Sequence, residues 1–169
     1  MPRIQRTHYS GCFTQGRGRN FPERTMATFF VSMTRLRVRS WHYVPFFFVQ
    51  AFRSARQAKS ADGVLSVTVL REARNTFWTR TVWINEQAMK NFMLTGPHGR
   101  VMRRLMEWCD EAAVAHWTQD SPEPPSWDEA HRRLQDSGRP SKVNHPSEDQ
   151  RNNRIPAPRI QSTRELHFK

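Results

Sequence analysis

The stretch WTRTVWINEQAMKNF, residues 78–92, decides the fold because it contains a change from strand to helix. Its first half alternates aromatic or β-branched residues with polar ones, which is typical of a strand. Asn85 then suits a helix N-cap, Glu86 suits the first turn, and apolar residues follow at helical spacing. Trp78 and Trp83 fall on opposite faces of the strand because strand side chains alternate, so the predicted sheet is apolar on both faces.

Upstream of this stretch, the pattern predicts a strand, a helix and a second strand. Residues 28–38 are rich in β-branched and aromatic residues. A helix begins between residues 41 and 45 and runs to about Lys59, ahead of Gly63, which suits a left-handed cap. The short EARN link within residues 64–84 then predicts an antiparallel hairpin. The buried side of the helix is predicted to hold Val44, Phe47, Phe48, Ala51, Phe52 and Ala55, with Gln50, Arg53, Arg56 and Gln57 in water.

Downstream, the helix that follows Asn85 is predicted to break at TGPHG, residues 95–99. Pro97 restarts it at a first helical position, and apolar residues recur at helical spacing as far as Cys109. Residues 112–119 are the fourth predicted strand. The order strand, helix, strand, strand, broken helix, strand indicates an α+β, ferredoxin-like βαββαβ fold with a four-stranded antiparallel sheet.

The two apolar faces of this sheet bear on its oligomeric state. Helices of a ferredoxin-like domain cover one face only, so the second face needs a cover of its own. We predict a homodimer, a dimeric α+β barrel, in which this face packs against a second copy. The second copy is not needed if a short helix predicted over residues 126–138, with the Ser126 and Glu129 capping box and Gly138 at its end, folds across the face.

The chain divides into four predicted segments. Residues 1–25 are a disordered or optional extension before a start at Met26, and residues 26–120 form the ferredoxin-like domain. Residues 121–140 hold a Pro-rich linker and the C-terminal helix. Residues 141–169 are a basic, largely irregular tail, because Pro, Asn, Arg and Ser dominate there with few apolar anchors.

The net charge of +12 lies mainly in the two tails. Residues 1–25 carry five Arg against one Glu, and residues 141–169 carry six Lys or Arg against three acidic residues, which leaves +5 for the rest of the chain. Charges of both signs are interspersed in that middle part, as on an ordinary solvated surface. The sequence therefore argues against nucleic acid as the partner.

Cysteine content and motifs exclude several other classes. Cys12 and Cys109 supply neither a disulfide framework nor a zinc cluster, which fits a cytoplasmic protein. The longest apolar run lies within residues 44–52, far short of the roughly 20 residues that span a bilayer, so no membrane span is predicted. Since motifs for a phosphate loop or a metal site are also absent, we predict no metal site.

Two histidines are the candidates for chemistry. His98 lies at a predicted helix start between Gly96 and Gly99, where a ligand has room and the helix dipole favours a neutral imidazole. It is the candidate catalytic residue, with a surface or capping role as the alternative. His116 lies on the last strand beside Trp117, and it is either a substrate contact or a hydrogen-bonded core histidine.

Flat apolar side chains are numerous and allow two interpretations. They either line a pocket for a flat hydrophobic small molecule or form the core and the dimer interface. Trp83 and Phe92 are expected near His98. The full set is Trp78, Trp83, Met89, Phe92, Met102, Met106, Trp108 and Trp117. Nearby Arg100, Arg103 and Arg104 either bind an acidic ligand or form a solvated helix face, and we prefer the solvated face.

RTVWINEQAMKNF, residues 80–92, followed by HGRVM, residues 98–102, resembles the dimeric α+β barrel superfamily of antibiotic-biosynthesis-monooxygenase-like proteins. The resemblance covers about residues 26–120. It implies a pocket between sheet and helices and an activity among cofactor-free oxygenation, heme degradation and carotenoid oxygenation. The stretch from residue 106 through SWDEAHRRL, residues 126–134, is similar to an uncharacterised bacterial branch.

The resemblance also implies where a heme-degrading member would hold its iron. Such members use an Asn on the first strand, a Trp after the hairpin and a His ligand, and these positions hold Thr34, Phe92 and Met102 here. Because all three differ, no cofactor is predicted, and heme is kept as the alternative. Together with Trp83 and His116, these three residues are the candidate substrate contacts.

The sequence thus leaves two hypotheses for the function. The resemblance implies an uncharacterised monooxygenase-like protein that binds, and as a cofactor-independent enzyme oxidises, a flat hydrophobic small molecule between sheet and helices. The alternative is a non-enzymatic dimeric structural or interaction protein, whose aromatic residues are core and interface and whose basic tails dock on a partner.

Overall fold

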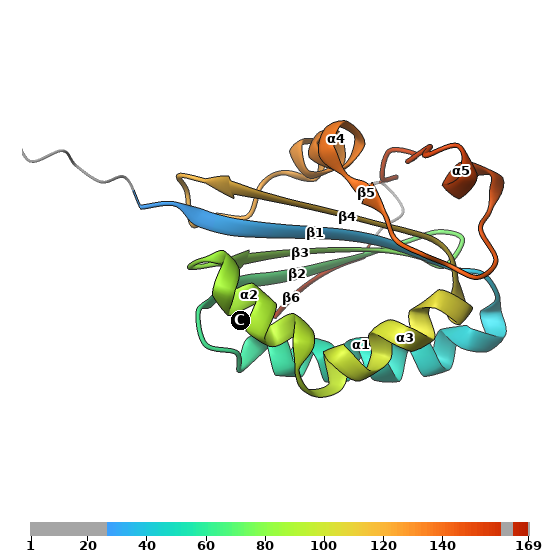
Figure 1. Cartoon of the computed structure of the whole chain (residues 1–169), viewed down its shortest axis with the longest axis horizontal. Helices are drawn as coiled ribbons and strands as arrows, with labels where there is room; N and C mark the ends of the chain where they lie inside the picture. The colour runs from blue at the N-terminus through green and yellow to red at the C-terminus, as the bar shows by residue number, and fades with distance from the viewer. Residues whose placement is uncertain (1–26, 160–163, 169) are drawn as a thin grey trace, which may run out of the picture.

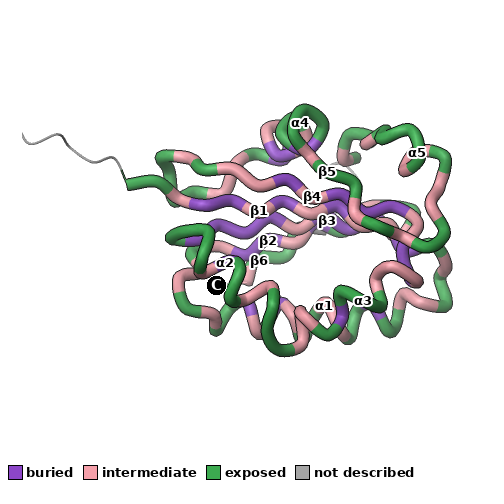
Figure 2. Tube along the Cα trace, in the orientation of Figure 1, coloured by how far each residue is buried: buried purple, intermediate pink, exposed green. Residues whose placement is uncertain are grey.

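The computed structural model describes residues 27–159 and 164–168. The predicted extension 1–25, the start at Met26 and Cys12 lie outside these residues. The described chain forms three layers, with a sheet between helices α1, α2 and α3 on one face and helix α4 on the other (Figure 1). Burial is concentrated in the sheet, while the outward sides of the helices are exposed (Figure 2).

Four long antiparallel strands form the centre of the sheet. They are β1 (Phe29–Val38), β2 (Val64–Glu72), β3 (Thr76–Trp83) and β4 (Cys109–Gln119), in the order β4-β1-β3-β2. The predicted strands agree with these bounds except that β4 begins earlier, at Cys109. This order and the intervening helices are those of the predicted ferredoxin-like βαββαβ unit.

Within the described residues the sheet has six strands, and the prediction of four was wrong. β5 (Arg139–Pro140) adds to the edge of β4, and β6 (Arg164–Phe168) adds to the edge of β2. β5 has two residues and β6 has five, so neither carries enough alternation to be recognised as a strand. Both come from segments that the sequence assigned to a linker helix and an irregular tail.

The helical layer follows the predicted pattern closely. It consists of the 3-10 turn η1 (Trp41–Tyr43), α1 (Val44–Lys59), α2 (Glu86–Leu94) and α3 (Gly96–Trp108). The Asn85 side chain caps α2 by accepting from the Ala88 N–H at 2.8 Å. Because α2 ends at Leu94 and α3 begins at Gly96, the predicted break falls at Thr95. Pro97 lies in the first turn of α3. Gly63 has φ +80°, and a side chain there would collide with Ile84.

The prediction for the buried side of α1 needs correction. Phe47, Ala55 and Ala58 are buried, but Phe48 is 37% and Phe52 is 57% exposed. The helix is turned so that Phe47, Ala55 and Ala58 face inward, while Phe48 packs edge-on against Phe77 and Phe52 is largely exposed. Sequence periodicity gives the spacing of a buried stripe but does not fix its centre to within one residue.

Both faces of the sheet are apolar, as predicted, and the chain covers both of them. On the helical face, Phe30, Trp83 and Met89 form one cluster, and a second cluster surrounds Phe77 and Trp108. On the other face, α4 (Trp127–Ser137) packs on Met33, Leu70, Trp78, Ala113 and Ala115 through Trp127, Ala130 and Leu134. Because α4 covers the second face, a second copy of the chain is not needed to bury it. A homodimer through this face loses its physical basis, and the oligomeric state itself stays a prediction.

The segment after α4 holds the edge of β4. Gln150, in α5 (Glu148–Arg151), accepts from the Ala112 N–H at 3.0 Å and donates to its carbonyl at 3.1 Å. Ser147 donates to Glu111, which also pairs with Arg35 at 2.5 Å in a buried ion pair. The part of the tail that was expected to be irregular therefore includes α5 and β6 and completes the sheet.

Candidate functional site

Three rings lie in a row where the α2–α3 break meets the end of β3. Phe92 stacks on Trp83 with ring centroids 5.2 Å apart, and His98 packs on Phe92 at 4.6 Å. Trp83 is 0% exposed, and its indole N–H donates to the Thr81 hydroxyl at 2.8 Å. The structure thus brings together the three residues that the sequence proposed as neighbours. Because Trp83 is closed off from solvent, its role is to support Phe92.

The surroundings of His98 determine its protonation state. Nδ1 lies 3.1 Å from the Met93 carbonyl oxygen, so Nδ1–H donates there and Nε2 keeps its lone pair in the neutral ring. Burial lowers the pKa of His98 below its ordinary value of 6.5, and the bond to Met93 opposes this shift only in part. His98 is therefore a neutral imidazole at neutral pH, held in the tautomer whose Nε2 is able to accept a proton.

The cause of this neutral state differs from the predicted one. The sequence argument invoked the helix dipole and open space beside Gly96 and Gly99. A side chain at Gly96 would meet Gln57, and one at Gly99 would meet the Leu94 carbonyl, so the protein itself occupies both spaces. Gly96 has φ +59°, a backbone conformation that favours glycine. The turn between α2 and α3 therefore accounts for a glycine at this position.

Gln57 is the residue at this site that sequence reasoning missed, since it was assigned to solvent. Its Oε1 accepts from the His98 backbone N–H at 2.9 Å. Its Nε2 donates to the carbonyls of Phe92 at 3.2 Å and Thr95 at 3.0 Å. The Thr95 side chain makes no cap bond to α3, so the free N–H groups at the start of α3 need another acceptor. Nothing in the sequence signalled this role of Gln57, because Thr95 is itself a residue type that caps helices well.

A strip of polar side chains crosses the helical face of the sheet between the two apolar clusters. Ser32 and Thr34 on β1 pair with Thr81 and Thr79 on β3, while His116 on β4 lies opposite Ser32. Of these, Ser32, Thr34, Thr79 and His116 are only partly buried, although helices cover this face. Thr34 thus lies on the face that the resemblance implied for the pocket.

His116 borders the same apolar cluster from the opposite side. Its ring lies 5.4 Å from that of Phe30, which packs with Trp83. Burial lowers the pKa of His116. The positive charges of Arg139 and Lys90, on neighbouring elements, lower this pKa further, and the negative charge of Glu86 opposes the shift. His98 and His116 therefore both flank the Phe30, Trp83 and Met89 cluster, one through Phe92 and the other through Phe30.

Met102 is not part of this arrangement. Its side chain is 43% exposed on α3, outside both apolar clusters of the helical face. The position that would carry a heme-iron ligand by resemblance therefore lies apart from the ring row. Within residues 27–159 and 164–168, no group of three or more His, Cys, Asp or Glu side chains is arranged to hold a metal ion. Burial raises the pKa of Cys109 to about 12, so its thiol stays protonated.

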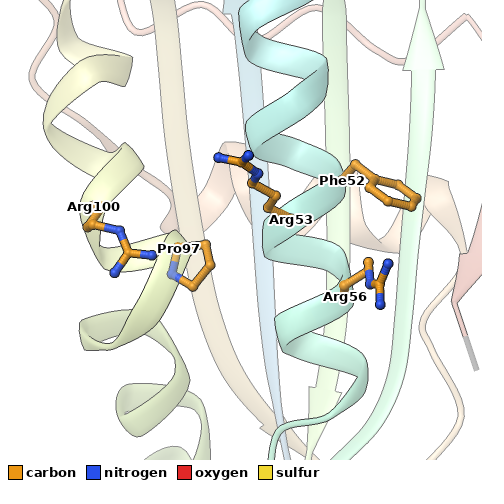
Figure 3. Close-up of a pocket in the computed structure, with 5 residues that line it drawn as sticks. All are labelled: Phe52, Arg53, Arg56, Pro97 and Arg100. Carbon is orange, nitrogen blue, oxygen red and sulfur yellow. The ribbon is translucent and has the colours of Figure 1, made fainter.

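A groove of about 470 Å³ lies on the outside of the helical layer, between α1 and α3. It is lined by Pro97 and Arg100 on α3 and by Phe52, Arg53 and Arg56 on α1. Figure 3 shows Arg53 projecting toward α3, where Pro97 and Arg100 lie, and Phe52 and Arg56 on the other side of α1. The groove is open to solvent and lined by three guanidinium groups, so it suits an anionic group and not the flat apolar molecule of the sequence hypothesis.

The fold and the site define a ferredoxin-like α+β protein with a partly buried histidine just after the break between two helices. The sequence profile described as Domain of unknown function (DUF3291) matches residues 45–140, which is more than half of the chain. The chain belongs to this family. Among curated proteins, none matches the sequence.

Solved structures similar to this chain include proteins described as putative antibiotic biosynthesis monooxygenases. SnoaB, a cofactor-independent oxygenase from Streptomyces nogalater, is 19% identical with a TM-score of 0.43, over 55% of this chain and 92% of its own. A protein of unknown function from Nitrosomonas europaea is 11% identical with a TM-score of 0.49, over 60% of this chain and 98% of its own. Because the identities are low and the scores lie below 0.5, no conclusion about this chain is drawn from these likenesses.

No helix in the described part of the chain has both the length and the apolar character needed to cross a bilayer.

Proposed function

We propose that this protein binds a flat hydrophobic small molecule between the sheet and the helical layer, with His98 as its polar contact. The row formed by Trp83, Phe92 and His98 carries the proposal. Trp83 and Phe92 form an apolar stack, and His98 offers a neutral imidazole at the end of this row. The partly open strip at Ser32 and Thr34 supplies hydroxyl groups that orient a ligand.

The chemistry that suits this site is proton removal ahead of oxygenation. With Nδ1–H donated to the Met93 carbonyl, Nε2 of His98 is the atom that accepts a proton from an O–H group of the bound compound. Dioxygen is the oxidant in this proposal, and the protein supplies the base and the apolar surroundings. No cofactor is assigned.

The test compares the wild type with His98→Ala. Native mass spectrometry of the purified protein and a thermal-shift screen of flat aromatic compounds measure binding, and oxygen consumption measures turnover. We expect His98→Ala to lose turnover and to weaken binding at least about tenfold, which corresponds to one good hydrogen bond. His145→Ala is the control because His145 is an exposed histidine that pairs with Glu107, away from the ring row.

The pH dependence supplies a second criterion. Since the pKa of His98 is lowered from 6.5, turnover should be constant above pH 6.5 and should fall only at a lower pH, where the imidazole becomes protonated. The same shift affects stability, because the pKa of His98 in the folded state lies below the value of 6.5 in the unfolded state. The free energy of unfolding is therefore higher above pH 6.5, and this contribution is lost as the pH falls through the folded pKa.

A different outcome favours the alternative function. If no compound binds, and His98→Ala lowers the melting temperature while the other measurements stay unchanged, His98 is a structural cap. The aromatic residues are then core alone, as in the non-enzymatic interaction protein that the sequence also allowed.

A further inference from the structure

Helices α1 and α3 form a strongly basic outer layer. The only acidic residue in these two helices is Glu107, which pairs with Arg39 at 2.6 Å. Among the described residues, no ion pair involves any of the six basic side chains of the two helices. They are Arg53, Arg56, Lys59, Arg100, Arg103 and Arg104. The positive charge of this surface is therefore uncompensated within the described chain.

The same surface exposes large apolar side chains. On α1, Phe46 is 64%, Val49 is 52% and Phe52 is 57% exposed, and Trp41 just before the helix is 70% exposed. Val49 and Arg53 are one helical turn apart and Phe52 and Arg56 are another such pair, so the apolar and basic residues occupy one outward ridge. Its first half is apolar and its second half basic. Figure 1 shows α1 and α3 side by side as the outermost layer of this face.

Three arginines, two from α1 and one from α3, line the groove of about 470 Å³. Arginine binds phosphate oxygens through pairs of parallel N–H groups, and it is less strongly hydrated than lysine. Phe52 and Pro97 in the same lining provide apolar contact beside the charged groups (Figure 3). The groove thus suits a phosphate with an apolar group attached to it.

We propose that the α1–α3 face, defined by the ridge of α1 and the groove residues, docks on an anionic lipid bilayer. Lipid phosphates occupy the groove between Arg53, Arg56 and Arg100, while Phe46, Val49 and Phe52 enter the boundary between headgroups and acyl chains. Aromatic side chains beside unpaired arginines are the composition that holds a helix in the plane of such an interface. The surface lies outside the His98 site, so it is tested independently of the proposed function.

Two other partners fit the surface less well. A second copy would place the uncompensated arginines of one face against those of the other, since a two-fold interface brings the same patch together. Nucleic acid matches the charge, but it does not match the exposed aliphatic and aromatic ridge, because its backbone and base edges call for polar contacts.

The experiment is co-sedimentation of the full chain with vesicles. One set contains phosphatidylcholine alone, and in the other phosphatidylglycerol replaces part of it. We expect binding to the anionic vesicles only, weakening as salt is added. The triple variant Arg53→Gln, Arg56→Gln and Arg100→Gln should lower the partition coefficient at least about tenfold. The double variant Phe46→Ser and Phe52→Ser should also lower it, with the salt dependence kept.

A matched triple variant controls for net charge alone. It changes Arg132, Arg151 and Arg154, three exposed arginines on α4, on α5 and just after it, to Gln. Binding should stay within about twofold of the wild type, since these residues lie away from the α1–α3 face. Melting temperatures check that all variants fold, and the single Arg100→Gln variant replaces the triple variant if that one does not.

Three results would overturn the proposal. These are no binding to anionic vesicles, equal binding to both kinds of vesicle, or equal losses in the two triple variants. Binding to an RNA or DNA oligonucleotide without vesicle binding, and its loss in the Arg53, Arg56 and Arg100 variant, would assign the surface to nucleic acid.

Discussion

At the scale of single residues, Gln57 connects α1 to the segment that carries His98. One side chain supplies both an acceptor for the His98 N–H and a donor for two carbonyls before it. It therefore does at this break what an N-cap and a C-cap do at ordinary helix ends. The position of the His98 ring depends on a residue that touches only its backbone.

Replacing Gln57 with Leu should cost about 1–3 kcal/mol of unfolding free energy, because the His98 N–H and the carbonyls of Phe92 and Thr95 lose their partner. Gln57→Glu keeps the acceptor but loses the donor, so its loss should be smaller. Urea unfolding measures both values. Gln50→Leu is the control, two turns earlier on the same helix. Equal effects at Gln57 and Gln50 would show that these bonds contribute nothing measurable.

Residue-scale features of the site were predictable where sequence neighbours decide them. Trp83 ends a strand and Phe92 lies in the helix that follows at once, so their contact is local and was expected. Gln57 reaches His98 across 41 positions, and a contact of that kind depends on the rotation of α1 against α3. That rotation also decides whether Phe48 and Phe52 face the sheet or the solvent. The spacing of apolar residues in the sequence does not determine the rotation.

At the scale of elements, α4 substitutes for the partner that the two apolar faces required. Leu134 and Ala130 are 0% exposed between this helix and the sheet, and Trp127 lies under the Arg80 guanidinium at 4.1 Å. Arg80 also pairs with Glu165 at 2.6 Å, which ties β6 to the central strands. The sequence named this helix as the one alternative to a dimer, because its capping box and length were visible. It did not predict the docking, which depends on shape.

Leu134→Ala should lower the unfolding free energy by about 2–5 kcal/mol, the usual range for a buried leucine whose removal leaves a cavity. Leu94→Ala is the matched control, since Leu94 is 74% exposed and should change the value by no more than about 0.5 kcal/mol. Denaturant unfolding of both variants gives the comparison. A small effect at Leu134 would mean that α4 is not firmly packed on the sheet in solution.

At the scale of the whole molecule, the sheet is covered on both faces by one chain (Figure 1). A chain that ends at Asp120 lacks α4 and should expose Met33, Leu70 and Trp78, an apolar surface that soluble monomers do not tolerate. Light scattering should therefore give a higher association state for the shortened chain than for the full chain. A shortened chain that stays monomeric and as stable as the full chain would contradict this view of α4.

The class of the fold followed from the order of elements alone, because strand and helix periods are properties of local sequence. The number of strands did not follow, because β5 and β6 are stabilised by pairing with neighbours and not by their own pattern. The same reasoning holds for the candidate site. Its residue types were visible, but the polar strip at Ser32 and Thr34 emerged only when three strands were placed in register.

The way in which the C-terminal segment holds β4 has a consequence for self-assembly. Ser141 and Ser147 donate their N–H groups to the carbonyls of Ala112 and Asp110, at 2.8 and 3.0 Å, and Gln150 binds Ala112 as a neighbouring strand would. An extended peptide that approached this margin would find these groups already bonded, and Pro140 in β5 has no N–H to offer. The part of this margin from Asp110 to Val114 therefore does not serve as a template for strand-by-strand growth into fibrils.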